Sequence, residues 1–208
     1  MEMAMSDHKI SGRFTFGELT EESTPLRIMH SALEEISTNG LSGLTTKGIS
    51  QRANLSTGII HHYFDTKDNL VYAAYVYLVR DLHQSSLAIF RNETDPKKRL
   101  QAMIRMNFSS VHISPEARDV WPQFWAQAAH DERAARLLRV YYRRFQSNLA
   151  HDFRALLGDR NKAQEAANLL LASIHGVWFV HRFSDSPKQM EQAVALIEQN
   201  LELLLKRP

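Results

Sequence analysis

The sequence contains no cysteine, which excludes disulfide bonds, thiolate zinc sites, cysteine nucleophiles and thiol-based redox sensing. Glycine and proline are also scarce, with 8 and 6 among 208 residues. The sequence has no alternating run rich in Val, Ile or Thr, and its apolar residues recur instead at spacings of three and four. These features predict an all-α protein.

Strong net charge and long apolar runs are missing as well. The formal net charge is +2, so any affinity for nucleic acid has to come from a local patch. The longest apolar run, residues 166–180, is interrupted by Asn168, Ser173 and His175 and is too short to span a membrane. The N-terminus lacks the basic start and apolar core of a signal peptide. We therefore expect a cytoplasmic protein that does not bind membranes.

The most informative stretch is residues 46–67, TKGISQRANLSTGIIHHYFDTK. We expect Thr46 to cap a short helix that has Ile49 on its buried face. Asn54 tolerates the left-handed backbone of a tight turn, and Ser56 can cap a second helix immediately afterwards. Two short helices joined by a turn of three or four residues form the unit whose second helix enters the major groove of DNA.

Residues in and after this stretch follow a familiar order: Thr46, Ile49, Ala53, Leu55, Ser56, Gly58, Tyr63, Phe64, Lys67 and Leu70. This order resembles the TetR family of transcriptional repressors. The sequence departs from the family pattern at Ser50 and Asn54, where Ala and Gly are usual, and at His61 and Tyr63, where Tyr and His are usual. We expect these departures to alter contacts and to leave the fold unchanged.

The resemblance implies a set of DNA-binding residues: Thr46, Lys47, Thr57, Gly58, Ile59, His61, Tyr63 and Lys67. Thr46, Lys47 and Lys67 are placed for phosphates, which fix the position of the protein on DNA. The other five face the groove, where base edges supply sequence choice. Gly58 permits a close approach of the backbone, and Ile59 can contact a thymine methyl group.

The domain organisation is expected to have three parts. Residues 1–23 form a flexible leader, residues 24–66 a three-helix helix-turn-helix domain, and residues 67–208 an effector-binding and dimerisation domain. TetR relatives often begin the first helix with a run of Arg or Lys that grips phosphates. Here the aligned positions are Thr24, Pro25 and Leu26, preceded by Glu18, Glu21 and Glu22. The expected helices cover residues 24–40, 67–90, 97–111, 120–129, 132–157, 162–182 and 187–205, with the two short helices of the motif between residues 46 and 66.

Aromatic residues are concentrated in the second half of the chain. Trp121, Phe124 and Trp125 fall on one side of a helix, and Tyr141 and Trp178 bring rings from two further helices. Aromatic rings can hold a quaternary ammonium group by cation–π attraction of about 0.5–2 kcal/mol. The same rings can also form ordinary hydrophobic core. These five residues are the candidate effector-binding residues.

Four segments resemble the BetI-type regulators of choline-to-glycine-betaine synthesis: WPQFWAQAAHD from Trp121, YYRRFQSNLAHDFRALL at 141–157, GVW at 176–178 and LSTGIIHHYF in the motif. The resemblance implies a homodimeric repressor that choline releases from a palindromic operator, with the helix at 67–90 as the lever. It also implies dimerisation through the last two helices. The alternative is a TetR-type regulator of another pathway with an aromatic or hydrophobic effector.

The ten histidines raise an enzymatic alternative. His130-Asp131 and His151-Asp152 are similar to the His-Asp pair of helical metal-dependent phosphohydrolases. Dense metal-ligand spacing such as HExxH does not occur in the sequence, so we expect neither enzyme activity nor a metal or cofactor. A helical adaptor that binds only protein would leave the helix-turn-helix motif unexplained.

Overall fold

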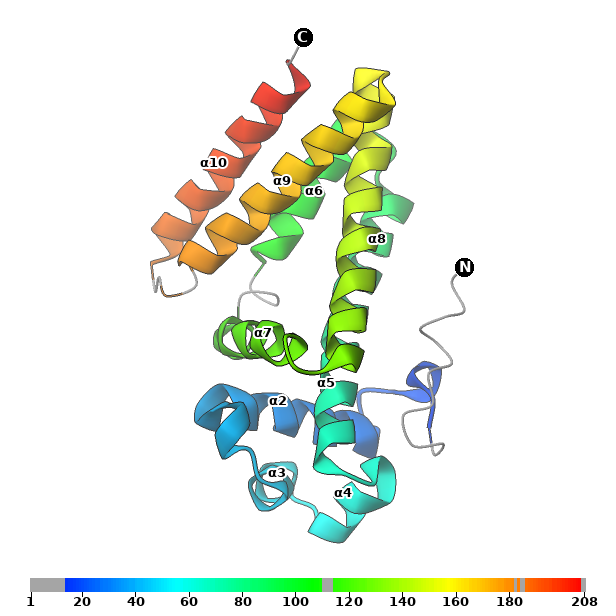
Figure 1. Ribbon diagram of the computed structural model, residues 1–208, viewed down its shortest axis with the longest axis vertical. Coiled ribbons are helices and arrows are strands. Elements are labelled where there is room, and N and C mark those ends of the chain that lie inside the picture. The colour runs from blue at the N-terminus through cyan, green and yellow to red at the C-terminus, as the bar shows by residue number, and fades with distance from the viewer. Residues whose placement is uncertain (1–13, 110–113, 182, 184–185, 207–208) are drawn as a thin grey trace. The chain divides into compact units, whose positions relative to one another are not determined.

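The computed structural model describes residues 14–109, 114–181, 183 and 186–206, and every regular element within these ranges is a helix (Figure 1), which confirms the all-α prediction. The elements are η1 (Phe16–Glu18), α2 (Thr24–Gly43), α3 (Thr46–Ala53), α4 (Thr57–Phe64), α5 (Lys67–Asn92), α6 (Pro96–Asn107), α7 (Pro115–Ala128), α8 (Glu132–Leu157), α9 (Arg160–His181) and α10 (Pro187–Leu205). None of the described helices combines the length and apolarity needed to cross a membrane.

Most predicted helix boundaries agree with the structure, and α7 is the main exception. It begins at Pro115, whereas the prediction began the helix near residue 120. The predicted end of the α6 helix, residues 110–111, and residue 182 at the predicted end of α9 lie outside the described residues.

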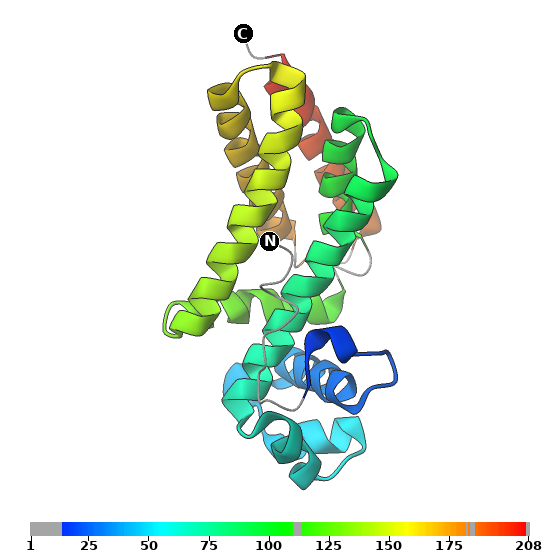
Figure 2. The same cartoon turned by 90° about the vertical axis from the view of Figure 1, so that its right-hand side faces the viewer.

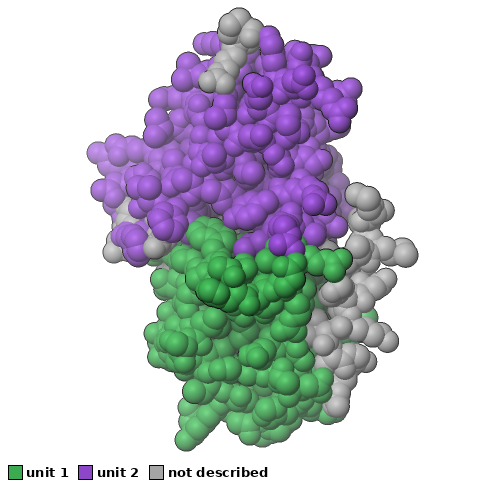
Figure 3. Space-filling view, viewed as in Figure 1, with its two compact units in different colours: residues 1–81, 115–137 green, residues 82–114, 138–208 purple. Residues whose placement is uncertain are grey.

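The chain forms two compact units (Figure 3). Unit 1 consists of residues 1–81 and 115–137, and unit 2 of residues 82–114 and 138–208. The predicted domain boundary at residue 66 therefore falls inside unit 1, which also includes α7.

In unit 1, helices α2, α3 and α4 are grouped around the first turns of α5 (Figure 2). Burying each large apolar side chain contributes about 1.5–3 kcal/mol relative to leaving it exposed. The fully buried side chains include Ile28, Met29, Ile36, Leu44, Ile49, Ile60, Phe64, Leu70, Tyr75 and Phe124. This core holds the two helices of the helix-turn-helix motif in place.

Unit 2 contains α6, α9, α10 and the remaining parts of α5 and α8, and α9 and α10 lie side by side (Figure 1). Two ion pairs of 2.7 Å join α6 to α10, Lys97 with Glu202 and Arg105 with Glu198. Its buried apolar side chains include Leu100, Met103, Ile104, Leu149, Phe153, Ala167, Leu170, Ile174, Ile197 and Leu201.

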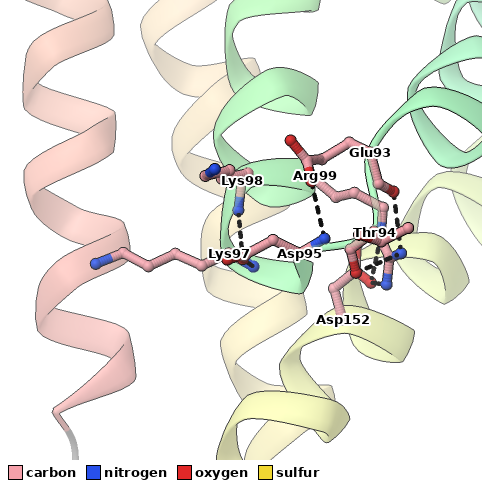
Figure 4. Close-up of polar contacts among 7 residues, drawn as sticks. All are labelled: Glu93, Thr94, Asp95, Lys97, Lys98, Arg99 and Asp152. Carbon is pink, nitrogen blue, oxygen red and sulfur yellow. Dashed lines mark hydrogen bonds and ion pairs between the residues drawn. The ribbon is translucent and has the colours of Figure 1, made fainter.

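A buried ion pair ties the turn between α5 and α6 to α8 in unit 2 (Figure 4). Arg99 donates from Nε and Nη2 to Oδ1 of the fully buried Asp152, at 2.9 and 2.5 Å. Its Nη1 donates to the carbonyl oxygens of Glu93 and Thr94 at 3.3 and 3.2 Å. Removing one partner of such a pair costs about 3–5 kcal/mol, because the other charge stays buried. The pair is therefore a structural element of unit 2.

Candidate functional site

The helix-turn-helix has the expected turn. Asn54 lies in the left-handed region with φ 50° and ψ 50°, which confirms the prediction for this residue. Ser56 caps α4, since its hydroxyl oxygen accepts a hydrogen bond from the backbone N–H of Ile59 at 3.4 Å. Ile60 and Phe64 are buried, at 2% and 0% exposure, and fix the inner face of α4.

The cap of α3 differs from the prediction by one residue. Thr45 caps the helix, and its Oγ1 accepts a hydrogen bond from the backbone N–H of Gly48 at 3.0 Å. Thr46 is the first residue of the helix, so the prediction of Thr46 as the cap is wrong. Two adjacent threonines carry the same capping chemistry, and only the backbone conformation distinguishes them.

The predicted groove-facing residues lie on the outer face of α4. Thr57, Gly58, Ile59 and His61 are exposed, and Tyr63 is half-buried. A Cβ atom at Gly58 would lie 3.8 Å from Oγ of Ser56, its nearest described neighbour. Packing of the protein therefore does not require glycine at this position. His62, which the predicted set does not include, is also exposed.

The residues predicted for phosphates lie at the two ends of the motif. Lys47 is exposed near the start of α3, and Thr46 is half-buried. Lys67 is exposed, and its Nζ donates a hydrogen bond to the carbonyl oxygen of Leu44 at 3.1 Å. An ammonium group has three donors, so this bond fixes the start of α5 and still allows a phosphate contact.

A buried carboxylate joins α3 to α2, and the sequence reasoning missed it. Glu35 is only 6% exposed; its Oε2 accepts from Nε of Arg52 at 2.5 Å, and its Oε1 accepts from Nδ2 of Asn39 at 2.9 Å. The hydrogen bond from Arg52 is the main cause that holds the pKa of Glu35 below its ordinary value. A Cβ atom at Gly48 would overlap Oε1 of Glu35. Gly48 inside a short helix was the signal that could have indicated this close approach.

Helix α7 is hydrogen-bonded to the C-terminal end of α2 within unit 1. Oε1 of Gln123 accepts from the backbone N–H of Leu41, and its Nε2 donates to the carbonyl oxygen of Ile36 at 3.1 Å. Oγ of Ser37 donates to Oδ2 of Asp119 at 3.0 Å. The helix that carries three of the predicted effector residues is therefore attached directly to the helix that supports the motif.

The three effector candidates of α7 form an aromatic cluster with Tyr75 of α5, all within unit 1. The rings of Tyr75 and Phe124 stack with centroids 4.1 Å apart. Trp121 lies 5.7 Å from Phe124 and 6.2 Å from Trp125. We call Tyr75, Trp121, Phe124 and Trp125 the aromatic cluster.

Tyr75 is the member of the aromatic cluster that the sequence reasoning missed. The residue is fully buried, and its hydroxyl group has no hydrogen-bond partner among the described residues. Burial raises the pKa of this hydroxyl, so the group remains a proton donor. A buried hydroxyl without a partner costs about 1–3 kcal/mol. A ligand that bonded to Tyr75 would recover that cost.

The other two candidates, Tyr141 and Trp178, belong to unit 2. Tyr141 stacks on Phe145 at 6.1 Å, and both rings lie edge-on to the imidazole of His175 at 6.5 and 6.2 Å. Burial lowers the pKa of His175, which favours its neutral form. Trp178 is 7% exposed on α9. The structure thus divides the five predicted residues between the two units.

The His-Asp pairs of the enzymatic alternative have structural roles. Oδ1 of Asp131 accepts from the backbone N–H groups of Arg133 and Ala134 at 2.8 and 3.4 Å, which caps α8. Asp152 accepts both hydrogen bonds from Arg99. Among the described residues, no three His, Asp or Glu side chains gather in a group that could hold a metal ion.

The helix-turn-helix in unit 1 and the helical unit 2 define a DNA-binding transcriptional regulator. Residues 28–74 match the family model for bacterial regulatory proteins of the tetR family, and residues 96–206 match that for the C-terminal part of BetI-type transcriptional repressors. HTH-type transcriptional regulators BetI from Burkholderia cenocepacia and Burkholderia ambifaria are each 36% identical over 180 residues, covering 86% of this chain and 92% of theirs. The chain belongs to the TetR family and, within it, to the BetI-type repressors.

Two solved structures have the same fold. A transcriptional regulator from Pseudomonas aeruginosa PAO1 matches with a TM-score of 0.78 at 24% identity, covering 91% of this chain and 94% of its own. A regulator from Saccharomonospora viridis in complex with choline matches with a TM-score of 0.75 at 19% identity, covering 86% of this chain and 95% of its own.

Proposed function

We propose that this protein represses genes of choline and glycine betaine metabolism and that a small cationic effector such as choline releases it from a palindromic operator. The attachment of α7 to α2 carries this proposal, because it joins the aromatic cluster to the DNA-reading helices within one unit. The BetI relatives and the choline-bound regulator of the same fold support the choice of effector.

Chemistry supports a quaternary ammonium alcohol as the ligand of the aromatic cluster. Ring faces attract a cation by about 0.5–2 kcal/mol each without a compensating buried charge. The hydroxyl of Tyr75 supplies one hydrogen bond for the polar end of such a molecule. Trp121, Phe124 and Trp125 are the proposed effector contacts of unit 1, and Tyr141 and Trp178 are the candidates of unit 2.

The DNA contacts are proposed on the exposed side of the motif. Thr46, Lys47 and Lys67 contact phosphates at its two ends. Thr57, Gly58, Ile59, His61 and Tyr63 contact base edges from the outer face of α4. Ile59 is 36% exposed, and an exposed β-branched side chain on this face suits a thymine methyl group.

In this proposal, the contacts that couple effector binding to release from DNA all lie in unit 1. An effector that alters the packing of Tyr75 on Phe124 shifts α5 against α7. Gln123 and Asp119 transmit the change to α2, which positions α3 through Glu35 and Arg52. The effector has to bind the released state more tightly than the DNA-bound state, since equal affinity for both shifts nothing. Operator and effector then weaken each other's binding by the same factor.

A homodimer is proposed through α9 and α10 of unit 2. Leu169, Leu196 and Leu203 are large apolar side chains on these helices and are 41%, 58% and 66% exposed. A second copy would cover them in a four-helix bundle. A two-fold dimer presents two recognition helices to successive major grooves, about 34 Å apart, and therefore reads a palindromic site.

Calorimetry of choline binding tests the proposal, with the protein alone and bound to DNA from upstream of its own gene. We expect calorimetry to show weaker choline binding in the presence of the operator. Footprinting should show that the protein protects this DNA. The uncharged isostere 3,3-dimethyl-1-butanol is the control, because it keeps the shape and hydroxyl of choline without the charge. Equal binding of both compounds would favour a hydrophobic effector. Choline binding that the operator leaves unchanged would contradict the coupling.

A further inference from the structure

Two phenylalanines before the first long helix are buried in unit 1. Phe14 is 8% and Phe16 is 5% exposed, although both precede the helix-turn-helix domain in the chain. The ring of Phe14 lies edge-on to Phe64 with centroids 5.6 Å apart, and edge-on to Tyr63 at 6.4 Å. Phe14 therefore packs on the last two residues of α4, the helix that carries the proposed base contacts.

The segment that presents Phe14 is held in place by its own bonds. The backbone N–H of Thr15 donates to Oε2 of Glu18 at 2.7 Å, and the backbone N–H of Glu18 donates to the carbonyl oxygen of Thr15 at 3.1 Å. The guanidinium of Arg80 on α5 lies over the ring of Phe16, 5.1 Å from its centroid. These contacts form a clip that we define as residues 14–18.

The clip contacts one of the proposed DNA-binding residues, Tyr63. Phe64 is fully buried and is not among the proposed DNA contacts. Tyr63 is half-buried, and besides Phe14 its ring has the ring of His62 at 5.2 Å and that of Phe64 at 6.5 Å between centroids. An edge-to-face contact restricts the orientation of an aromatic ring. Phe14 is therefore placed to restrict the ring of Tyr63 before DNA binds.

We propose that Phe14 is a positioning residue for operator recognition. It holds the ring of Tyr63 in the orientation in which the side chain contacts DNA. The conformational entropy of this side chain is then lost when the protein folds and not when it binds DNA. The inference rests on the proposed function, in which Tyr63 faces the groove. Positioning of a base contact raises specific affinity and leaves the phosphate contacts of non-specific binding unchanged.

Replacing Phe14 with Leu tests the proposal, because Leu keeps an apolar side chain in the core and removes the ring. We expect operator affinity to fall roughly fivefold, as expected for one lost aromatic contact, with unchanged affinity for non-specific DNA and an unchanged salt dependence. Phe108→Leu is the matched control: it removes a ring with the same 8% exposure from unit 2, outside the clip, and it should change operator affinity less than about twofold. Both variants are compared well below their melting temperatures.

A double-variant cycle with Tyr63→Ala separates positioning from a general loss of structure. Phe14→Leu should have no further effect on operator affinity once Tyr63 is absent. A second measurement uses the protein without DNA, in which nitration of Tyr63 by tetranitromethane should be faster in Phe14→Leu than in Phe108→Leu.

Unchanged operator affinity in Phe14→Leu would overturn the inference, and so would an equal loss of operator affinity in the Tyr63→Ala background. Neither result would affect the proposed function as long as the wild-type protein binds the operator. Failure of the wild-type protein to bind the operator would instead contradict the proposed function. The nitration comparison then decides whether Phe14 orients Tyr63.

Discussion

Nε of Arg52 on α3 donates a hydrogen bond to Oε2 of Glu35 on α2 over 2.5 Å, while the other oxygen of the same carboxylate occupies the space beside Gly48. Charge and shape are therefore matched across this helix pair. The missing side chain at Gly48 makes room for the carboxylate, and Arg52 compensates its negative charge. Because α4 follows α3 after the short turn at Asn54, the pair also fixes where the recognition helix begins.

Gly48→Ala should destabilise the wild-type protein more than a Glu35→Ala background. In the wild-type protein the added methyl group overlaps Oε1 of Glu35, which the bond from Asn39 holds in place, so the free energy of unfolding should fall. In a Glu35→Ala background the overlap with the carboxylate is absent, and Oγ1 of Thr45, at 3.1 Å, is the remaining close neighbour of the added methyl group, so the fall in the free energy of unfolding should be smaller. Urea unfolding of the four proteins measures this cycle. An identical effect in both backgrounds would show that the carboxylate does not restrict position 48.

The pairing of Glu35 should also make stability depend on pH. A carboxyl group whose pKa is lower in the folded state stabilises the fold above its unfolded pKa and loses that contribution as the pH falls. For Glu35 the loss should begin below about pH 4.5, its ordinary pKa, because the bond from Arg52 lowers the folded value. The comparison is urea unfolding of wild type and Glu35→Gln between pH 7 and pH 3. The difference between their free energies of unfolding should be constant down to about pH 5 and should shrink at lower pH.

Gly58→Ala should separate stability from DNA binding. The site has room for a methyl group, and Ala in place of Gly should stabilise α4 by about 0.5–1 kcal/mol. The same methyl group would keep the helix away from the groove, so operator affinity should fall about tenfold, the equivalent of one good base contact. Gly176→Ala on α9 is the control, since no described atom lies within 4 Å of a Cβ atom there. Fluorescence anisotropy with labelled operator measures affinity, and unchanged binding by Gly58→Ala would exclude a close backbone approach.

Tyr75→Phe should weaken effector binding without destabilising the protein. The change removes a buried hydroxyl that has no hydrogen-bond partner among the described residues and keeps the ring that stacks on Phe124. A ligand bond to this hydroxyl is worth about 0.5–1.5 kcal/mol, so choline affinity should fall about 2- to 12-fold. Thermal unfolding and calorimetry measure the two quantities. Tyr72→Phe on the same helix is the control, and an equal loss of choline affinity in both variants would argue against a specific role for Tyr75.

The helix-turn-helix could be predicted because its signals are local. Asn54 in the turn, the Ser56 cap and the buried spacing of Ile60 and Phe64 all lie within a few residues of one another. The start of α7 was missed although Pro115 suits the first position of a helix, because Ser114-Pro115 indicates a turn equally well.

The candidate site could be predicted less completely, because its supporting contacts join distant parts of the chain. Glu35 and Arg52 lie on different helices, and Phe14 contacts Tyr63 although the two residues are far apart in the sequence. Helical spacing shows which residues share a face, but it does not show which face of another helix they meet. For the same reason Tyr75 was indistinguishable from an ordinary core residue until its ring was found against Phe124.

The bonds from α7 to α2 affect how this repressor can be rebuilt. A hybrid regulator can be made by joining the DNA-reading segment of one protein to the sensor of another. A graft that ends at residue 66 would leave Leu41 and Ser37 without their partners Gln123 and Asp119. We expect such a chimera to keep its DNA-binding specificity only when residues 115–137 are transferred together with residues 14–81. The transferable module of this protein is therefore discontinuous in sequence.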